Sequence, residues 1–182
     1  TFSIVKAPDW INVIALTPKN EIILVELYRY GIEKPTLELP GGIIDPGEKP
    51  PETCKRELLE ETGFSGDEMI SLGRVSSNPA FLTNYTYTYI IKNCTKVAPQ
   101  KLDGNERINV HVLPLDDFLE LVHQGVVHHS LVVAAVARFL LWRGLFFLMS
   151  KVPALLVSPR TILFFQRSST VLICLFSAVF AT

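Results

Sequence analysis

The segment that most constrains this chain runs from Gly42 to Phe64 and reads GIIDPGEKPPETCKRELLEETGF. Pro50 and Pro51 suit the first turn of a helix, where the backbone needs no amide donor. Gly63 suits the position just past a helix end. The segment therefore predicts a loop followed by a helix of about three turns.

Three glutamates crowd the end of this helix. Glu57, Glu60 and Glu61 stand at spacings i, i+3 and i+4, which places them on one face. Like charges at these spacings cost about 0.2–0.5 kcal/mol per pair, and Arg56, four residues before Glu60, is the nearby cation. Two interpretations follow: a solvated acidic helix face, or a site in which carboxylates hold a hard divalent cation such as Mg²⁺ or Mn²⁺.

Glycines before the helix favour the second interpretation. Gly41, Gly42 and Gly47 let the backbone pass close to whatever the helix face binds, and a main-chain carbonyl there could be a further ligand.

The spacing of the whole segment resembles the Nudix box. The matching positions are Gly42, Glu48, Arg56, Glu57, Leu58, Glu60, Glu61, Gly63 and Phe64. The resemblance covers roughly residues 4–143. It implies an enzyme that cleaves a nucleoside diphosphate linked to another group, with water attacking one phosphorus and divalent metal ions neutralising charge.

The resemblance also implies roles for residues of the box. Glu57 and Glu61 would be the principal metal ligands, Glu60 a further ligand or a group that holds water, and Gly41 would offer its carbonyl oxygen. Gly42 is expected to contact the substrate.

Three further residues outside the metal ligands receive roles from the resemblance. Glu48 and Arg56 would form an ion pair that braces the loop against the helix and orients the site. Arg29, at the end of a strand, would contact phosphate, with a surface arginine as the alternative.

Four weaker marks are similar to the ADP-ribose and ADP-sugar diphosphatase branch of the family: LELPGGIIDPGE, APDWINVIALT, LYRY and HSLVVAAVARFL. In that branch an acidic loop before a late strand supplies a metal ligand or general base. The corresponding loop here is LDGNER, in which Glu106 is the first candidate and Asp103 the second. Gly104 stands where some relatives carry an acid.

The resemblance thus implies Mg²⁺-dependent hydrolysis of ADP-ribose or a related nucleotide sugar to AMP and a sugar phosphate, with Mn²⁺ able to substitute. Two alternatives stay open. One is hydrolysis of another nucleoside diphosphate derivative, such as a nucleoside triphosphate, GDP-mannose or a dinucleoside polyphosphate. The other is a nucleotide sensor that binds without cleaving. Members of the branch are commonly dimers, so a homodimer is the assembly to test.

Charge and cysteine content limit the partners and the compartment. The formal charge of −1 gives no basic field for nucleic acid. The cysteines, Cys54, Cys94 and Cys174, are odd in number and lack metal-ligand spacing, which indicates a reducing, cytoplasmic setting. The chain begins at Thr1 without a signal peptide, and we expect that the start of the domain is missing.

Hydrophobic periodicity outside the box predicts an α+β fold, and the resemblance implies an α/β/α sandwich around a mixed sheet. Strands are expected in segments 2–17, 21–30, 36–40, 69–77, 84–92 and 106–114, and helices in 115–125 and 129–144. Residues 1–143 are expected to form the Nudix domain.

Residues 144–182 form an apolar tail that resembles no terminus of the family. The longest uninterrupted apolar stretch, near residues 171–181, is shorter than the roughly 20 residues that span a membrane. Three interpretations remain: an interfacial membrane segment, a membrane anchor, or a tail that was not selected as protein, which we favour over membrane contact.

Several tyrosines, histidines and one cysteine are expected to have structural rather than catalytic roles. Tyr85, Tyr87 and Tyr89 could stack on an adenine, but their alternation favours packing in a sheet. His128 and His129 are expected beside a helix start as polar neighbours of the cap. Cys54 is expected to be a buried filler of the helix rather than a nucleophile.

Overall fold

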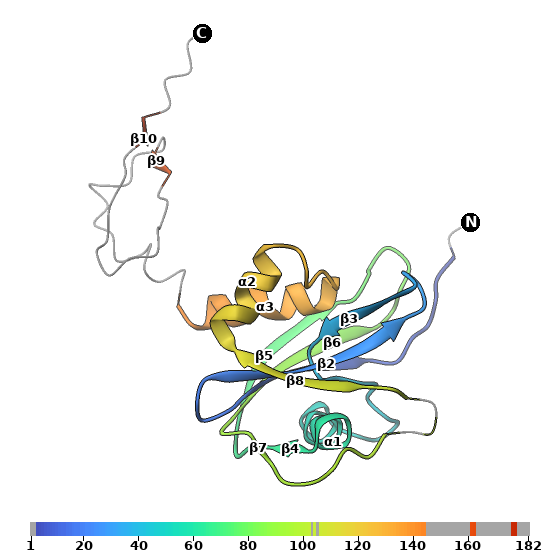
Figure 1. Ribbon diagram of the computed structural model, residues 1–182. Coiled ribbons are helices and arrows are strands. Elements are labelled where there is room, and N and C mark those ends of the chain that lie inside the picture. Colours follow the sequence, from blue (N-terminus) through green and yellow to red (C-terminus); the bar gives the residue numbers. More distant parts are fainter. Residues whose placement is uncertain (1–2, 103, 105, 145–160, 163–175, 178–182) are drawn as a thin grey trace. The chain divides into compact units, whose positions relative to one another are not determined.

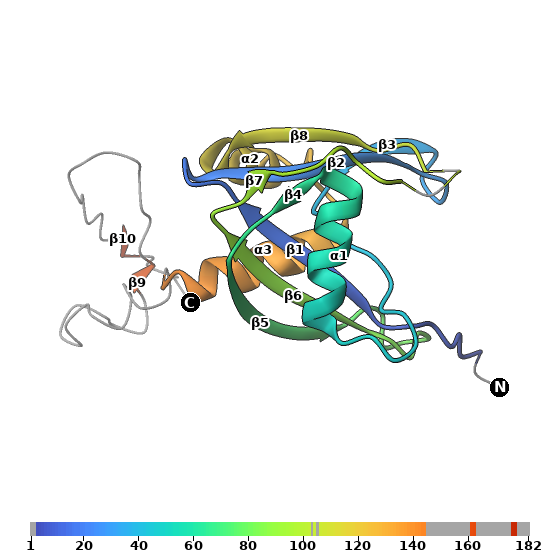
Figure 2. The same cartoon turned by 90° about the horizontal axis from the view of Figure 1, so that it is seen from below.

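A three-layer α/β/α sandwich forms the described core of the protein (Figure 1, Figure 2). The computed structural model describes residues 3–102, 104, 106–144, 161–162 and 176–177. A mixed sheet is covered on one face by α1 (Pro50–Thr62) and on the other by α2 (Leu115–His123) and α3 (Ser130–Trp142). The predicted α+β class and sandwich are confirmed.

The main sheet has six strands in the order β3-β2-β1-β6-β5, with β8 also paired to β2. Their bounds are β1 (Trp10–Leu16), β2 (Glu21–Arg29), β3 (Lys34–Glu38), β5 (Glu68–Ser76), β6 (Tyr85–Lys92) and β8 (Asn109–Pro114). β1 and β6 run parallel, while the other neighbours run antiparallel. Each of these strands overlaps a segment that the sequence predicted, although β3 begins two residues and β5 one residue before the predicted start.

A small second ladder was not predicted. β4 (Phe64–Ser65) pairs antiparallel with β7 (Thr95–Lys96) just after the end of α1. Strands of two residues show no hydrophobic alternation, so sequence periodicity could not distinguish them from loops.

Glycine and proline set the ends of α1. The two prolines occupy its first positions, and Gly63 ends it in the left-handed region with φ 72°. The Gly63 amide donates to the Leu59 carbonyl at 2.8 Å, which satisfies a carbonyl of the last turn.

Strict alternation along β1 divides the core into two layers. Ile11 and Val13 pack with Cys54 and Leu58 in the layer that includes α1. Ile14 belongs to the other layer, which includes the apolar side chains of α2 and α3. Because successive strand residues point to opposite faces, one apolar strand serves both layers.

A divergence between β1 and β2 makes room for the glycine-containing loop. β1 pairs with β2 only at Ala15↔Ile23 and Leu16↔Ile22, and further along β2 its partner on that edge is β3. The chain leaving β3 then bonds to β1, since the Val13 amide donates to the Pro40 carbonyl at 2.8 Å. The loop is therefore held between two strands of the sheet.

The chain divides into two compact units, Thr1–Leu140 and Leu141–Thr182. In the second unit the structure describes the end of α3 and two short antiparallel strands, β9 (Thr161–Ile162) and β10 (Phe176–Ser177). The interpretations given above for residues 144–182 concern residues that lie largely outside those described. In the described part of the chain, no helix is both long and apolar enough to cross a membrane.

Candidate active site

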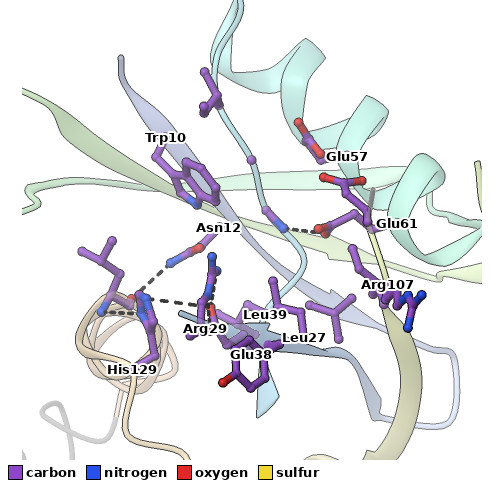
Figure 3. A pocket seen from close by; sticks show the side chains of 18 of the residues that line it. Trp10, Asn12, Leu27, Arg29, Glu38, Leu39, Glu57, Glu61, Arg107 and His129 are labelled. Carbon is purple, nitrogen blue, oxygen red and sulfur yellow. Dashed lines mark hydrogen bonds and ion pairs between the residues drawn. The ribbon is translucent and has the colours of Figure 1, made fainter. Parts of the chain in front are cut away.

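A pocket of about 1360 Å³ opens where β1 and β2 diverge (Figure 3). Its walls come from the strand ends, the glycine-containing loop, α1, the segment before β8 and the start of α3. The lining residues include Trp10, Asn12, Tyr28, Arg29, Tyr30, Glu38, Gly41, Gly42, Arg56, Glu57, Glu61, Glu106, Arg107, His129 and Leu131.

Two carboxylates of α1 lie directly against the glycine-containing loop. The Gly41 amide donates to Glu61 Oε2 at 2.9 Å. A Cβ atom on Gly42 would lie only 2.1 Å from Glu57 Oε1, so only glycine leaves this carboxylate its position. The predicted close passage of the backbone along the acidic helix face is thus present.

Burial and mutual repulsion perturb these carboxylates. Burial raises the pKa of Glu61 to about 8, the Gly41 amide acts against that rise, and the charges of Glu57 and Glu106 add to it. Burial also raises the pKa of Glu57, although Arg56 opposes the effect. Glu106 lines the same pocket. The charge of Glu106, from the segment before β8, therefore acts on both carboxylates of α1.

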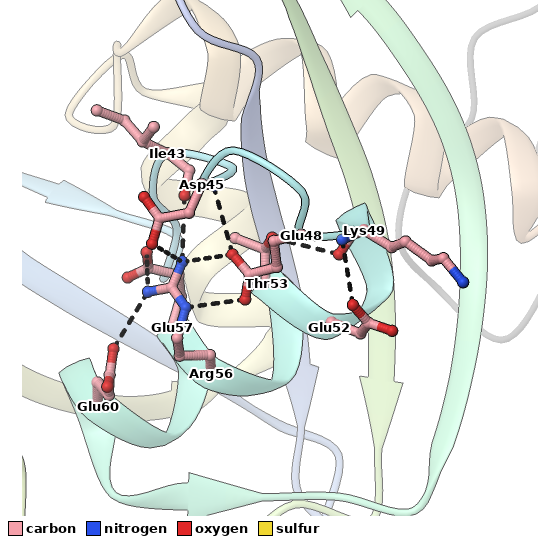
Figure 4. A network of polar contacts seen from close by, with 9 residues as sticks. All are labelled: Ile43, Asp45, Glu48, Lys49, Glu52, Thr53, Arg56, Glu57 and Glu60. Atoms are coloured by element: carbon pink, nitrogen blue, oxygen red, sulfur yellow. Dashed lines mark hydrogen bonds and ion pairs between the residues drawn. The ribbon is translucent and has the colours of Figure 1, made fainter.

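Arg56 is the hub of a polar network between the loop and α1 (Figure 4). Its Nε and Nη2 donate to the two carboxylate oxygens of Glu48 at 3.0 and 2.9 Å, and Nη2 also donates to the Ile43 carbonyl at 3.2 Å. Its Nη1 donates to Glu57 Oε1 at 2.7 Å and to Glu60 Oε2 at 3.2 Å. The ion pair expected between Glu48 and Arg56 is present, and it lowers the pKa of Glu48 to about 2.

The acidic face divides between the pocket and the network. Glu57 and Glu61 line the pocket, whereas Glu60 does not and instead accepts from Arg56. As the side chains lie, no group of three or more His, Cys, Asp or Glu among the described residues is arranged to hold a metal ion. The donor set nevertheless fits a hard divalent cation in its chemistry, since buried carboxylate oxygens are the ligands such ions prefer.

A second polar cluster lies at the other side of the pocket (Figure 3). Arg29 donates from Nε and Nη2 to the two oxygens of Glu38 at 2.7 and 2.8 Å. Burial of Glu38 opposes its ionisation, but the hydrogen bonds from Arg29 and Thr36 hold its pKa below the usual value. His129 Nε2 lies 3.9 Å from Glu38 Oε2.

Three further expectations from the sequence concern the tyrosines of β6, Cys54 and Asp103. The three tyrosines of β6 do not line the pocket; Tyr87 Oη accepts from Arg74 at 3.0 Å, and Tyr89 packs in the α1 layer of the core. Cys54 is fully buried, and burial raises the pKa of its thiol, as a filler residue requires. Asp103, the second candidate for the base, lies outside the described residues.

Sequence reasoning missed several residues that complete the pocket, among them Trp10, Asn12 and Glu38. His129 does support the helix start, since its Nδ1 accepts from the Leu131 amide at 3.3 Å, but it also lines the pocket. One signal was present: Asn12 is a lone polar residue in the apolar run of β1, and it is buried with Nδ2 donating to the Leu131 carbonyl at 3.2 Å.

Comparisons with known proteins agree with this architecture. The NUDIX domain family matches residues 8–135. The chain is 35% identical over 134 residues to a methanol dehydrogenase activator of Bacillus methanolicus, covering 73% of this chain and 72% of that protein. It is 29% identical over 134 residues to an ADP-ribose pyrophosphatase of Bacillus subtilis (strain 168), with the same coverage of both chains.

A solved structure shares the fold. The crystal structure of an ADP compounds hydrolase superposes with a TM-score of 0.65 at 24% sequence identity, covering 75% of this chain and 74% of that one.

Proposed function

This chain belongs to the NUDIX domain family, and from that premise we propose that it hydrolyses the diphosphate bond of ADP-ribose or a related nucleotide sugar. The products would be AMP and a sugar phosphate. The observation that carries the proposal is the pair of carboxylates on α1, the partly buried Glu57 and the buried Glu61, fixed against Gly42 and Gly41 at the pocket wall. The substrate class is supported by the relative named ADP-ribose pyrophosphatase.

We propose that the reaction depends on Mg²⁺, with Mn²⁺ as a substitute. Glu57 and Glu61 would be the principal ligands, with Glu60, Glu106 and the Gly41 carbonyl as further ligands. When bound, such an ion would neutralise charge on the diphosphate and lower the pKa of the attacking water.

The residues of the network would keep the site in order. Arg56 is held by both oxygens of Glu48 and by the Ile43 carbonyl, so its Nη1 fixes Glu57 and Glu60 in position. Glu48 and Arg56 thus act as positioning residues.

Two residues would act directly on the substrate. Glu106 would either be the further metal ligand named above or accept the proton of the attacking water, because it lines the pocket and its charge acts on Glu57 and Glu61. Arg29 would contact a phosphate oxygen, because it lines the same pocket at the end of β2.

The test is incubation of the purified chain with ADP-ribose and Mg²⁺, with AMP release followed by chromatography. We expect Glu61→Gln to lower kcat/KM more than about a hundredfold, since a ligand of the cation is lost. Glu68→Gln is the matched control, because Glu68 is exposed at the start of β5 and pairs with Lys92 of β6. Binding of ADP-ribose without AMP release would favour a nucleotide sensor.

We also propose that the protein is a cytoplasmic homodimer. Light scattering after size-exclusion chromatography checks the assembly, and cell fractionation checks the compartment. A monomer at micromolar concentration would contradict the first statement.

A further inference from the structure

We propose that the second polar cluster of the pocket binds sugar hydroxyl groups, with Glu38 and His129 holding one hydroxyl between them. The proposal rests on the proposed function, because it assigns a part of the same pocket to the sugar of the substrate. Figure 3 shows both side chains from the side of the pocket.

The tautomer of His129 follows from its contact with the helix start. Its Nδ1 accepts a hydrogen bond from the Leu131 amide at 3.3 Å. In a neutral imidazole one nitrogen accepts and the other carries the proton, so Nε2 is the donor. Burial lowers the pKa of His129, which favours this neutral form.

His129 and Glu38 are close enough for one hydroxyl oxygen, lying to one side of the pair, to reach both. His129 Nε2 and Glu38 Oε2 are 3.9 Å apart, which is too long for a direct hydrogen bond. A hydroxyl oxygen about 2.8 Å from each atom can accept from Nε2 and donate to Oε2. A hydroxyl group can do both at once, whereas a phosphate oxygen can only accept.

Glu38 is fixed well enough to act as such an acceptor. Its side chain is 5% exposed, and Arg29 donates to both of its oxygens. Oε1 also receives the Thr36 hydroxyl, while Oε2 receives Arg29 Nη2 at 2.8 Å. Because a carboxylate oxygen can accept more than one hydrogen bond, Oε2 can take a second donor from the pocket.

The charge of the cluster favours a sugar over a second anion site. Arg29 and Glu38 neutralise each other, and His129 is neutral, so the cluster carries no net positive charge. A phosphate oxygen placed beside His129 and Glu38 Oε2 would be repelled by the carboxylate. The phosphate contact proposed for Arg29 would instead use Nη1, which makes no hydrogen bond to Glu38. Trp10 lines the same pocket and offers an aromatic surface of the kind that packs against a sugar ring.

Asn12 is a positioning residue for this subsite. Its buried amide donates to the Leu131 carbonyl at 3.2 Å and so ties the start of α3 to β1. That tie holds the Leu131 amide, which in turn fixes the ring of His129.

Calorimetric binding in EDTA tests the inference without turnover. The ligands are ADP-ribose, the β-methyl ester of ADP, which lacks the terminal sugar, and ADP-ribose with a 2′,3′-dideoxyadenosine. We expect His129→Leu to weaken ADP-ribose binding roughly three- to tenfold, the effect of one hydrogen bond. The weakening should vanish for whichever ligand lacks the bound sugar.

Two further variants separate binding from structure. His129→Gln keeps an N–H donor and should recover part of the affinity, and His128→Ala, at the exposed neighbour, should leave it unchanged. The inference is overturned if His129→Leu weakens the binding of all three ligands equally or weakens none of them. It is also overturned if the wild type does not bind ADP-ribose. Hydrolysis with Mg²⁺ is measured separately, so a selective binding loss without turnover contradicts only the proposed function.

Discussion

At Gly41 and Gly42 the lack of a side chain decides where two acidic groups can lie. The position of a Cβ on Gly42 is occupied by the Glu57 carboxylate, and that of a Cβ on Gly41 lies 2.2 Å from the Ile11 carbonyl oxygen. A carboxylate at the end of a flexible side chain can move aside, but a backbone carbonyl inside a sheet cannot do so cheaply. Gly42 is therefore needed mainly for the position of the Glu57 carboxylate, and Gly41 mainly for the packing of the fold.

We predict that Gly42→Ala abolishes most of the activity while the protein remains folded, because the methyl group displaces Glu57. Gly41→Ala should instead lower the free energy of unfolding by about 1–3 kcal/mol, the usual cost of overpacking. Thermal unfolding and AMP release from ADP-ribose measure the two effects. Gly31→Ala is the control, since nothing lies within 4 Å of its Cβ position. Full activity of Gly42→Ala would contradict the placement of Glu57.

At the scale of elements, the ion pair between Arg29 and Glu38 fastens β2 to β3 at the pocket. Both residues end their strands, and the Glu38 carboxylate is buried while the Arg29 side chain is 34% exposed. A buried carboxylate without a partner is costly, so the hydrogen bonds from Arg29 stabilise the ionised form. The stability of this hairpin should therefore depend on pH in a defined direction.

We predict that Arg29→Met lowers the free energy of unfolding by about 1–3 kcal/mol near pH 7. In the wild type the pKa of Glu38 is below its ordinary value of 4.5, so the stabilisation is present above that pH and is lost as the pH falls through the folded value. In the variant, burial raises the pKa of Glu38 with only Thr36 and His129 left to oppose it, and protonation relieves the cost. The difference between the two proteins should shrink below about pH 4.

Urea unfolding from pH 3 to pH 8 measures this difference. Lys34→Met is the control, because Lys34 is exposed at the start of β3, the strand that ends at Glu38. A difference that stays constant or grows on acidification would contradict the role of the pair.

The elements themselves were largely predictable from the sequence, because most are long enough to show a period. β1 and β2 carry apolar runs, and α1 is bounded by prolines and Gly63. β4 and β7 were not predicted, because a strand of two residues is too short to show hydrophobic alternation.

At the scale of the whole molecule, residue spacing alone predicted the site only where one segment supplies it. Arg29 and Glu106, from other segments, were expected only through the family resemblance, and both line the pocket. The spacing within residues 42–64 predicted that Glu57 and Glu61 are neighbours, because both lie on a single helix. Glu38 and His129 come from β3 and from the start of α3, and only the sheet topology brings them together. Local patterns do not contain that information.

We predict that a chain ending at Arg143 folds and keeps its activity. All described residues of both core layers precede Leu141, and the pocket residues precede Val132. Its midpoint of thermal unfolding should lie within a few degrees of that of the full chain, since no described core contact is removed. Loss of cooperative unfolding, or a tenfold lower kcat/KM for ADP-ribose, would show that residues 144–182 support the domain.

A divalent cation bound among the acidic groups of the pocket, as proposed, would make the stability of the whole molecule depend on that cation. The charge of Glu57 raises the cost of ionising Glu61, and the charge of Glu106 raises it for both. A cation bound among these groups would therefore stabilise the folded state and not the unfolded state. We predict that free Mg²⁺ at about 100 times its Kd raises the free energy of unfolding by about 2.7 kcal/mol.

Thermal unfolding with Mg²⁺, Mn²⁺ or EDTA measures this stabilisation. Glu61→Gln should remove most of the shift, because one principal ligand is lost, whereas Glu68→Gln should keep it. The comparison holds the buffer and protein concentration fixed, so that only the linkage to the cation differs. If neither cation shifts the unfolding of the wild type, the carboxylates are not a metal site, and hydrolysis by this pocket would need another source of positive charge.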